Sequence, residues 1–191
     1  RALVRSRGLG DVYKRQIKWF SDSLLLNHLY TGGIYSSPIL NNSATYYLQS
    51  TYNFPSIFGG ELDNTFNTGG FFNGDQHLNF NANEACVIKS ALIYSEAANV
   101  VTFELRDSFG TVLDDTTLSL VSGQQRINLD FDVSIGIDYQ LGVSQGALQN
   151  TGLYRNNSGA SYPYNIGSSI TITSSSANSS PYGYYYFWCG F

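Results

Sequence analysis

Alternation of apolar and polar residues between Val101 and Val143 is the feature that most limits the fold of this chain. Successive side chains of a β-strand point to opposite faces, so this alternation predicts strands with one buried and one solvated face. The predicted inward-facing residues form three runs: Val101, Phe103 and Leu105; Ile127, Leu129, Phe131 and Val133; Tyr139, Leu141 and Val143. Turn signals at residues 107–110 and 122–123 bracket a return strand that runs from Val112 to Leu120. The pattern predicts an all-β fold with an antiparallel, jelly-roll-like β-sandwich.

The amino-acid composition agrees with an all-β chain. Aromatic residues make up 15% and charged residues only 13% of the sequence, and turn-forming Gly is frequent. No stretch shows an apolar stripe of helical period, so almost no helix is expected. No apolar run reaches the ~20 residues that a membrane-spanning helix needs.

Residues 1–16 differ from the rest of the chain. They contain five of the ten Lys and Arg but one of the fourteen Asp and Glu, and they resemble a translated sequencing adapter. We expect this segment to be non-native; the alternative is a basic targeting arm. The rest of the chain has 5 basic and 13 acidic residues, a net charge of −8, so nucleic acid is not an expected partner. The sequence contains no methionine, and we expect it to be a piece of a longer protein.

Residues 17–53 consist of short apolar and aromatic runs separated by Ser, Asn and Gly, which predict strands and turns. They resemble the C-terminal half of the immunoglobulin-like repeats of bacterial surface proteins. The matching positions are Trp19, Gly32, Pro38, Thr45, Tyr46 and Tyr47. About 37 residues are too few to bury a core alone, so a partial immunoglobulin-like domain is expected. Residues 54–72, rich in Gly and Asn, are predicted to be a linker that runs into the first loops of a second domain.

Residues 73–191 carry three more specific stretches: LYRNNSG at 153–159, YPY at 162–164 and YYYFW at 184–188. They resemble a β-sandwich module of bacterial surface proteins that are exported by the type IX secretion system. The resemblance implies a secreted or cell-surface location and a non-catalytic module for adhesion or display. The alternative is a carbohydrate-binding module appended to a secreted hydrolase. The partners would be glycans or other surface proteins.

The candidate ligand-binding residues come from these three stretches. They are Tyr154, Arg155, Asn156, Tyr164, Tyr186 and Trp188. Arg and Tyr in a loop can contact a glycan by stacking and bidentate hydrogen bonds. In the alternative account, Arg155 pairs with a strand carboxylate and the tyrosines pack over the end of the sandwich. Period-two alternation leaves Tyr184, Tyr186 and Trp188 on one face, where they form either an exposed aromatic row or one covered by a neighbouring loop.

No catalytic residue, metal ligand or cofactor is predicted. The two histidines, His28 and His77, lie in Asn-rich surroundings, and no nucleophile motif or phosphate loop occurs. Two groups of carboxylates each have two possible interpretations. Asp130 and Asp132 share the outward face of one strand, which suits either a solvated face or a glycosidase pair. The oxygen-rich segment with Glu61, Asp63, Asn64, Asn73 and Asp75 fits either turns made by Asx residues or a calcium site.

Cys86 and Cys189 lie about a hundred residues apart, near opposite ends of the second predicted domain. In an oxidising compartment they are predicted to form one disulfide. The alternative is a pair of buried free thiols. A zinc site lacks the His cluster that would complete it.

Overall fold

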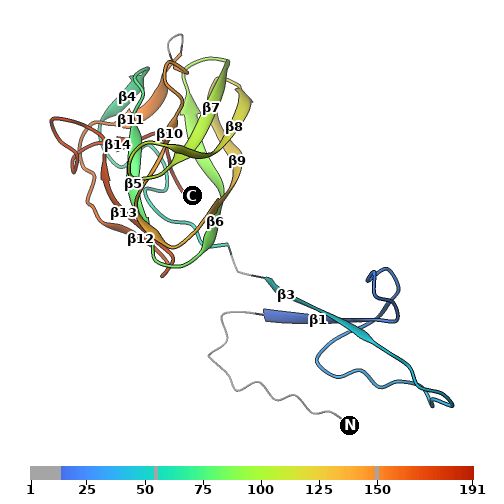
Figure 1. The fold of residues 1–191 in the computed structure, drawn as a ribbon. Helices are drawn as coiled ribbons and strands as arrows, with labels where there is room; N and C mark the ends of the chain where they lie inside the picture. Colours follow the sequence, from blue (N-terminus) through green and yellow to red (C-terminus); the bar gives the residue numbers. More distant parts are fainter. Residues whose placement is uncertain (1–13, 54–55, 149–150) are drawn as a thin grey trace. The chain divides into compact units, whose positions relative to one another are not determined.

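The computed structural model describes residues 14–53, 56–148 and 151–191, and within these ranges the chain is all β-strand, turn and loop (Figure 1). The described residues contain no apolar helix of membrane-spanning length. The chain divides into two units, Arg1–Ser56 and Ile57–Phe191.

The first unit is a three-stranded antiparallel sheet in the order β2-β1-β3. Its strands are β1 (Lys14–Phe20), β2 (His28–Thr31) and β3 (Tyr47–Asn53). Phe20 is buried, and the indole N–H of Trp19 donates a hydrogen bond to the carbonyl of Gly32 over 2.9 Å. Of the segment predicted to be non-native, residues 14–16 belong to β1 and residues 1–13 lie outside the described residues. The immunoglobulin-like assignment of this unit stays a prediction.

The second unit is a sandwich of two antiparallel sheets, as the alternation predicted. One sheet has the strand order β12-β13-β5-β10-β7-β8. Its strands are β12 (Tyr164–Ile166), β13 (Ile170–Ser175), β5 (His77–Ala82), β10 (Gly136–Val143), β7 (Asn99–Arg106) and β8 (Val112–Leu120). The other sheet has the strand order β14-β11-β6-β9. Its strands are β14 (Tyr185–Tyr186), β11 (Leu153–Asn156), β6 (Cys86–Ser95) and β9 (Gly123–Val133). A further strand, β4 (Gly69–Phe72), pairs with β11.

The core of the sandwich follows the period-two pattern of the sequence. The predicted inward-facing residues of β7 and β9 are all buried: Val101, Phe103, Leu105, Ile127, Leu129, Phe131 and Val133. The turn at residues 107–110 also forms as predicted, with Gly110 N donating to Asp107 O over 3.1 Å. Side-chain alternation therefore accounts for the central part of both sheets.

The C-terminal strand lies in a fork between β11 and β6. These two strands pair directly only at Leu153 and Ser95. Farther along, β11 pairs with β14, through Arg155 with Tyr186 and Asn156 with Tyr185. On the opposite side of the fork, β6 pairs with the same C-terminal segment through a bridge between Leu92 and Cys189. The C-terminal residues therefore fill the gap between β11 and β6 and complete this sheet.

The sandwich begins earlier than residue 73, so the predicted boundary is wrong. Gly59 N donates to Phe191 O over 2.9 Å, and Gly190 N donates to Glu61 O over 2.7 Å. Residues 69–72 form β4 rather than a loop. The segment from residue 57 to residue 72, predicted to be a linker and the entry loops of the second domain, is part of the sandwich because its backbone pairs with the C-terminal strand and with β11. Residues 54–55 of the predicted linker lie outside the described residues.

Candidate functional site

The aromatic row predicted at the C-terminus is buried. Tyr186 and Trp188 are 2% and 0% exposed, and Tyr185 and Phe187 are buried beside them. Phe187 has a φ of 63°, and Trp188 N donates to Tyr186 O over 2.7 Å, which closes a tight three-residue turn. Tyr185 is covered by the segment before β4, where its hydroxyl accepts from Glu61 N over 3.2 Å and its ring meets Phe66. The exposed row is therefore wrong, and neither Tyr186 nor Trp188 can stack on a ligand at the surface.

Arg155 lies among aromatic rings instead of beside a carboxylate. Its guanidinium carbon is 3.9 Å from the ring centroid of Phe72, 4.9 Å from that of Tyr184 and 5.4 Å from that of Tyr186. Its Nη1 donates to the hydroxyl of Tyr186 over 2.8 Å. The prediction of a strand carboxylate as partner is wrong, because the planar cation finds its partners in ring faces and a phenol oxygen. Arg155 therefore joins β11 to β4 and β14.

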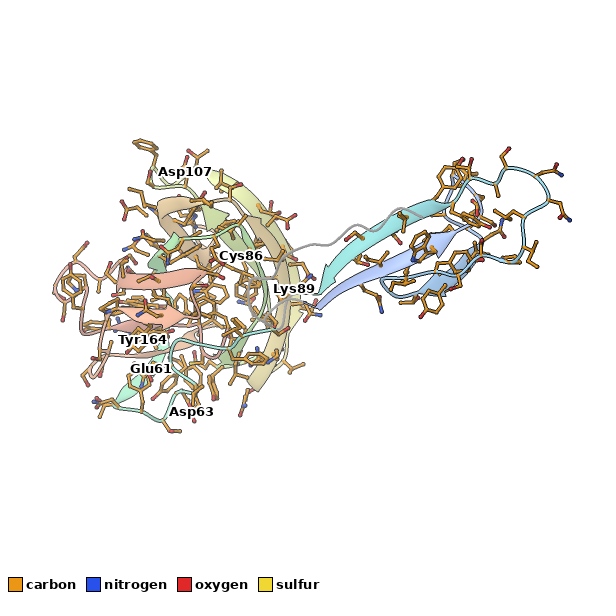
Figure 2. All side chains as sticks on the ribbon, turned by 90° about the horizontal axis from the view of Figure 1, so that it is seen from below. Glu61, Asp63, Cys86, Lys89, Asp107 and Tyr164 are labelled. Carbon is orange, nitrogen blue, oxygen red and sulfur yellow. The ribbon has the colours of Figure 1, made fainter. Side chains whose placement is uncertain are left out.

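Asn156 and Tyr164 also make structural contacts. The side chain of Asn156 is buried, and its Nδ2 donates to the carbonyls of Asn64 over 3.2 Å and Asn67 over 2.9 Å. The hydroxyl of Tyr164 donates to the carboxylate of Glu61, and the two lie side by side in Figure 2. Burial and this hydrogen bond raise the pKa of Tyr164 to about 12. Both predicted ligand residues hold the segment before β4 against the sandwich.

Tyr154 is the predicted ligand residue that reaches the outer surface. Leu153 before it is buried, so Tyr154 faces away from the core. Its ring contacts Phe71 on β4 edge to face, with centroids 5.7 Å apart, and Tyr94 on β6 at 6.3 Å. Phe71 is 48% exposed. We call Phe71, Tyr94 and Tyr154 the aromatic face. Phe71 and Tyr94 were not predicted as ligand residues, because Phe71 lies in the segment predicted to be linker and entry loops and only strand pairing brings it next to Tyr154.

Hydrogen-bonding side chains lie at the end of β4 and β11, next to the aromatic face. The hydroxyl of Thr68 donates to Asn157 Oδ1 over 2.9 Å and is also 2.9 Å from the hydroxyl of Ser158. Asn67 Oδ1 accepts from the hydroxyl of Ser158 over 3.2 Å. These side chains are mostly exposed and combine amide and hydroxyl groups, so they can donate to and accept from a polar ligand.

Comparison with known protein families, with curated proteins and with solved structures finds no match to this chain.

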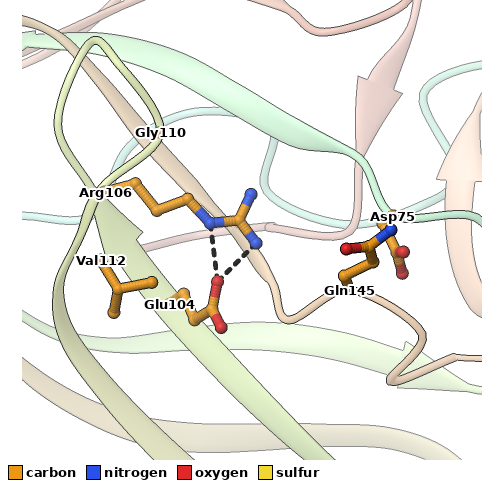
Figure 3. Close-up of a pocket in the computed structure, with 6 residues that line it drawn as sticks. All are labelled: Asp75, Glu104, Arg106, Gly110, Val112 and Gln145. Atoms are coloured by element: carbon orange, nitrogen blue, oxygen red, sulfur yellow. Dashed lines mark hydrogen bonds and ion pairs between the residues drawn. The ribbon is translucent and has the colours of Figure 1, made fainter.

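A polar pocket of about 610 Å³ opens at the outer face of the six-stranded sheet. Figure 3 shows the residues that line it, which are Asp75, Glu104, Arg106, Gly110, Val112 and Gln145. They come from the segment before β5, from the β7–β8 hairpin and from the segment after β10. Three stretches that are distant in the sequence therefore converge here, as they do at many binding sites built on a rigid scaffold.

Glu104 and Arg106 form one side of this pocket and make an ion pair there. Nε of Arg106 donates to Glu104 Oε2 over 2.6 Å, and Nη2 donates to the carbonyl of Val143. The two side chains are only 13% and 16% exposed. Both follow the alternation of β7 onto its outer face, which was predicted to be solvated, but surrounding segments cover most of their surface. The pocket itself was not predicted, because its sides come from three separate stretches.

The two histidines lie in different settings. His28 is exposed, and its Nε2 is 2.8 Å from Thr31 Oγ1. His77 begins β5 and is partly buried. Burial, with a smaller contribution from the positive charge of Arg106, lowers the pKa of His77 to about 4. His77 is therefore neutral at pH 7.

The acidic residues considered for calcium serve separate contacts. Asp63 Oδ1 accepts from the backbone N–H and the hydroxyl of Thr65, over 2.8 and 2.6 Å. Asp75 Oδ2 accepts from Gly146 N over 2.7 Å, and Glu61 holds Tyr164. Of the two interpretations, a turn made by an Asx residue agrees with the contacts of Asp63. In the described part of the chain, no three His, Cys, Asp or Glu side chains form a group that could hold a metal ion.

Asp130 and Asp132 lie exposed on β9, as expected for a solvated strand face. Lys89 on β6 pairs with Asp130 over 2.7 Å, and both side chains are more than half exposed. Asp130 has a φ of 55°, and the pairing of β6 with β9 shifts register beside it. This irregularity turns Asp130 towards Lys89.

The predicted disulfide is absent, since Cys86 and Cys189 are both free thiols. Cys189 pairs with Leu92, six residues along β6 from Cys86. At about 3.3 Å per residue this separates the two cysteines by roughly 20 Å, whereas a disulfide needs Cα atoms within about 7 Å. Burial raises the pKa of Cys189 to about 12.

Proposed function

We propose that this chain is a non-catalytic, extracellular binding module of a multidomain bacterial surface or secreted protein, and that its sandwich unit adheres to carbohydrate. The aromatic face carries this proposal. It combines a half-exposed Phe71 with Tyr154 on adjacent strands of a rigid sheet.

The chemistry of the aromatic face suits a sugar ring. Sugars present C–H groups on the faces of the ring, which pack against aromatic side chains, and hydroxyls at the rim. Phe71 and Tyr154 supply the apolar contact, and the amide and hydroxyl groups of Thr68, Asn157 and Ser158 lie at the end of the same two strands. The arrangement thus offers apolar contact beside hydrogen-bonding groups.

Structural roles of the titratable side chains support a non-catalytic module. His77 is held neutral by burial, Glu61 holds Tyr164, and Asp107 accepts hydrogen bonds from Phe109 N and Thr111 N, both over 2.9 Å. Glu61 and Asp107 thus fix a segment and a turn, and His77 carries no charge at pH 7. The extracellular location is supported by the sequence resemblance and by the low content of charged residues.

A glycan array with the purified full chain tests the proposal. Phe71→Ala and Tyr154→Ala each remove one ring of the aromatic face, and each is expected to lower binding about fivefold or more, because one stacked ring contributes about 1 kcal/mol or more. Phe109→Ala and Tyr182→Ala are matched controls, since these rings are 93% and 68% exposed elsewhere on the sandwich. Both controls should bind like the unmodified chain.

Three results would contradict the proposal. One is an array without reproducible binding, and another is binding that survives both Phe71→Ala and Tyr154→Ala. The third is an equal loss in the controls, which would indicate non-specific adhesion of exposed rings. Circular dichroism of each variant excludes unfolding as the cause of a loss.

A further inference from the structure

We infer that the polar pocket shown in Figure 3 is a second binding site, and that it takes the vicinal hydroxyl groups of a single sugar residue. This inference takes its ligand class from the proposed function but concerns a different set of residues. Asp75, Glu104, Arg106 and Gln145 supply its polar groups.

The ion pair leaves one nitrogen of the guanidinium and one oxygen of the carboxylate unused. Nε and Nη2 of Arg106 are engaged by Glu104 Oε2 and the carbonyl of Val143. Among the described residues, Nη1 of Arg106 and Oε1 of Glu104 have no hydrogen-bond partner. A hydroxyl group can accept a bond from the guanidinium while it donates one to the carboxylate. The pair therefore suits a neutral group with both functions.

Gly142 lies next to the guanidinium of Arg106. In the ladder it sits between Glu104 of β7 and His77 of β5. A Cβ at position 142 would be 2.9 Å from the Cβ of His77 and 3.5 Å from Nη1 of Arg106. The clash would be with His77, whereas 3.5 Å from Nη1 is an ordinary van der Waals contact. The ion pair with Glu104 and the bond to the carbonyl of Val143 hold Arg106 in place before a ligand arrives.

The opposite side of the pocket supplies a second donor and acceptor set. Asp75 Oδ2 accepts from Gly146 N over 2.7 Å, which holds the segment with Gln145 next to the segment before β5. Oδ1 of Asp75 and the amide of Gln145 have no partner among the described residues. The two polar pairs thus offer donors and acceptors to the hydroxyls of a pyranose ring from both sides of the pocket.

Side-chain NMR of the ¹⁵N-labelled full chain tests the inference. The probes are the methyl α-glycosides of glucose, mannose and galactose, with 2-methoxytetrahydropyran as a ring without hydroxyls. We expect the Nε–H signal of Arg106 and the side-chain amide of Gln145 to shift together with at least one glycoside and not with the bare ring.

Variants then assign the site. Asp75→Asn keeps an oxygen for Gly146 N but removes the carboxylate, and Gln145→Ala removes the amide; each should weaken binding about tenfold. Gln124→Ala, an exposed glutamine on β9, is the control and should have no effect. Phe71→Ala and Tyr154→Ala should leave the Arg106 shift unchanged, which separates this site from the aromatic face.

Three outcomes would overturn the inference. The first is the absence of a saturable shift of Arg106 with any glycoside up to the solubility of the probe. The second is a shift that Asp75→Asn and Gln145→Ala leave intact. The third is a shift with methylammonium chloride alone, which would make the pocket a site for cations.

Discussion

The indole N–H of Trp188 donates a hydrogen bond to the backbone carbonyl of Leu141 over 3.0 Å, and so joins the C-terminal strand of one sheet to a central strand of the other. The ring also packs against Phe103, with centroids 5.3 Å apart. Trp188 is fully buried, so this contact crosses the interior of the sandwich. The C-terminal strand thus holds the two layers together and does not serve as a ligand surface.

Trp188→Phe should destabilise the sandwich by about 1–3 kcal/mol, because it removes the hydrogen bond and part of the ring. Trp188→Ala should destabilise it by about 4 kcal/mol, through the cavity left between the sheets. Urea unfolding followed by circular dichroism measures both values. Trp19→Phe, in the other unit, is the control and should leave the sandwich transition unchanged; similar losses in all three variants would contradict the role of Trp188.

Arg155→Met should destabilise the sandwich by about 1–2 kcal/mol, since it keeps the apolar stem but removes the cation from three ring faces. Arg155→Lys should not restore the full stability, because an ammonium group lacks the planar fork. A double-mutant cycle with Tyr186→Phe measures the coupling through the hydrogen bond of 2.8 Å. If the two changes have additive effects on the free energy of unfolding, Arg155 and the hydroxyl of Tyr186 are not coupled, which would contradict this hydrogen bond.

The sandwich should lose stability as the pH falls from about 6.5 to about 4. The pKa of His77 is about 4 in the folded protein and about 6.5 when unfolded, so the unfolded chain binds the extra proton first in this range. The full shift corresponds to about 3 kcal/mol at 1.36 kcal/mol per pKa unit, which solvent screening of the partly exposed ring reduces to about 1–2 kcal/mol. Melting temperatures measured between pH 4 and pH 8 report this change.

His77→Gln should flatten this pH dependence, whereas His28→Gln, at an exposed position, should leave it as it is. A pH profile that His77→Gln does not alter would assign the acid sensitivity to carboxylates instead.

The thiols should react in order of exposure. Iodoacetamide should label the half-buried Cys86 in the native chain and label Cys189 only in denaturant, because Cys189 is 4% exposed and its pKa is about 12. Mass spectrometry under non-reducing conditions should count two free thiols. A melting temperature that is higher without reductant than with it would indicate a disulfide and contradict the structure.

The sequence alone determined the central strands. Alternation at Val101, Phe103 and Leu105 predicted the buried face of β7 correctly, because the direction of a side chain in a strand depends only on its position along that strand. The turn after Arg106 was equally local, since Asp107 and Gly110 carry its chemistry within four residues.

Tertiary structure alone decided the fate of the C-terminal aromatic residues and of the candidate site. Tyr186 and Trp188 are buried because β11 and β6 diverge and leave a fork that this strand fills, and two strands far apart in the sequence set that fork. Arg155 meets Phe72 through the pairing of β11 with β4, and the pocket forms where Asp75, Arg106 and Gln145 converge. Local periodicity fixes which way a side chain points, but the partner that it meets depends on long-range strand pairing.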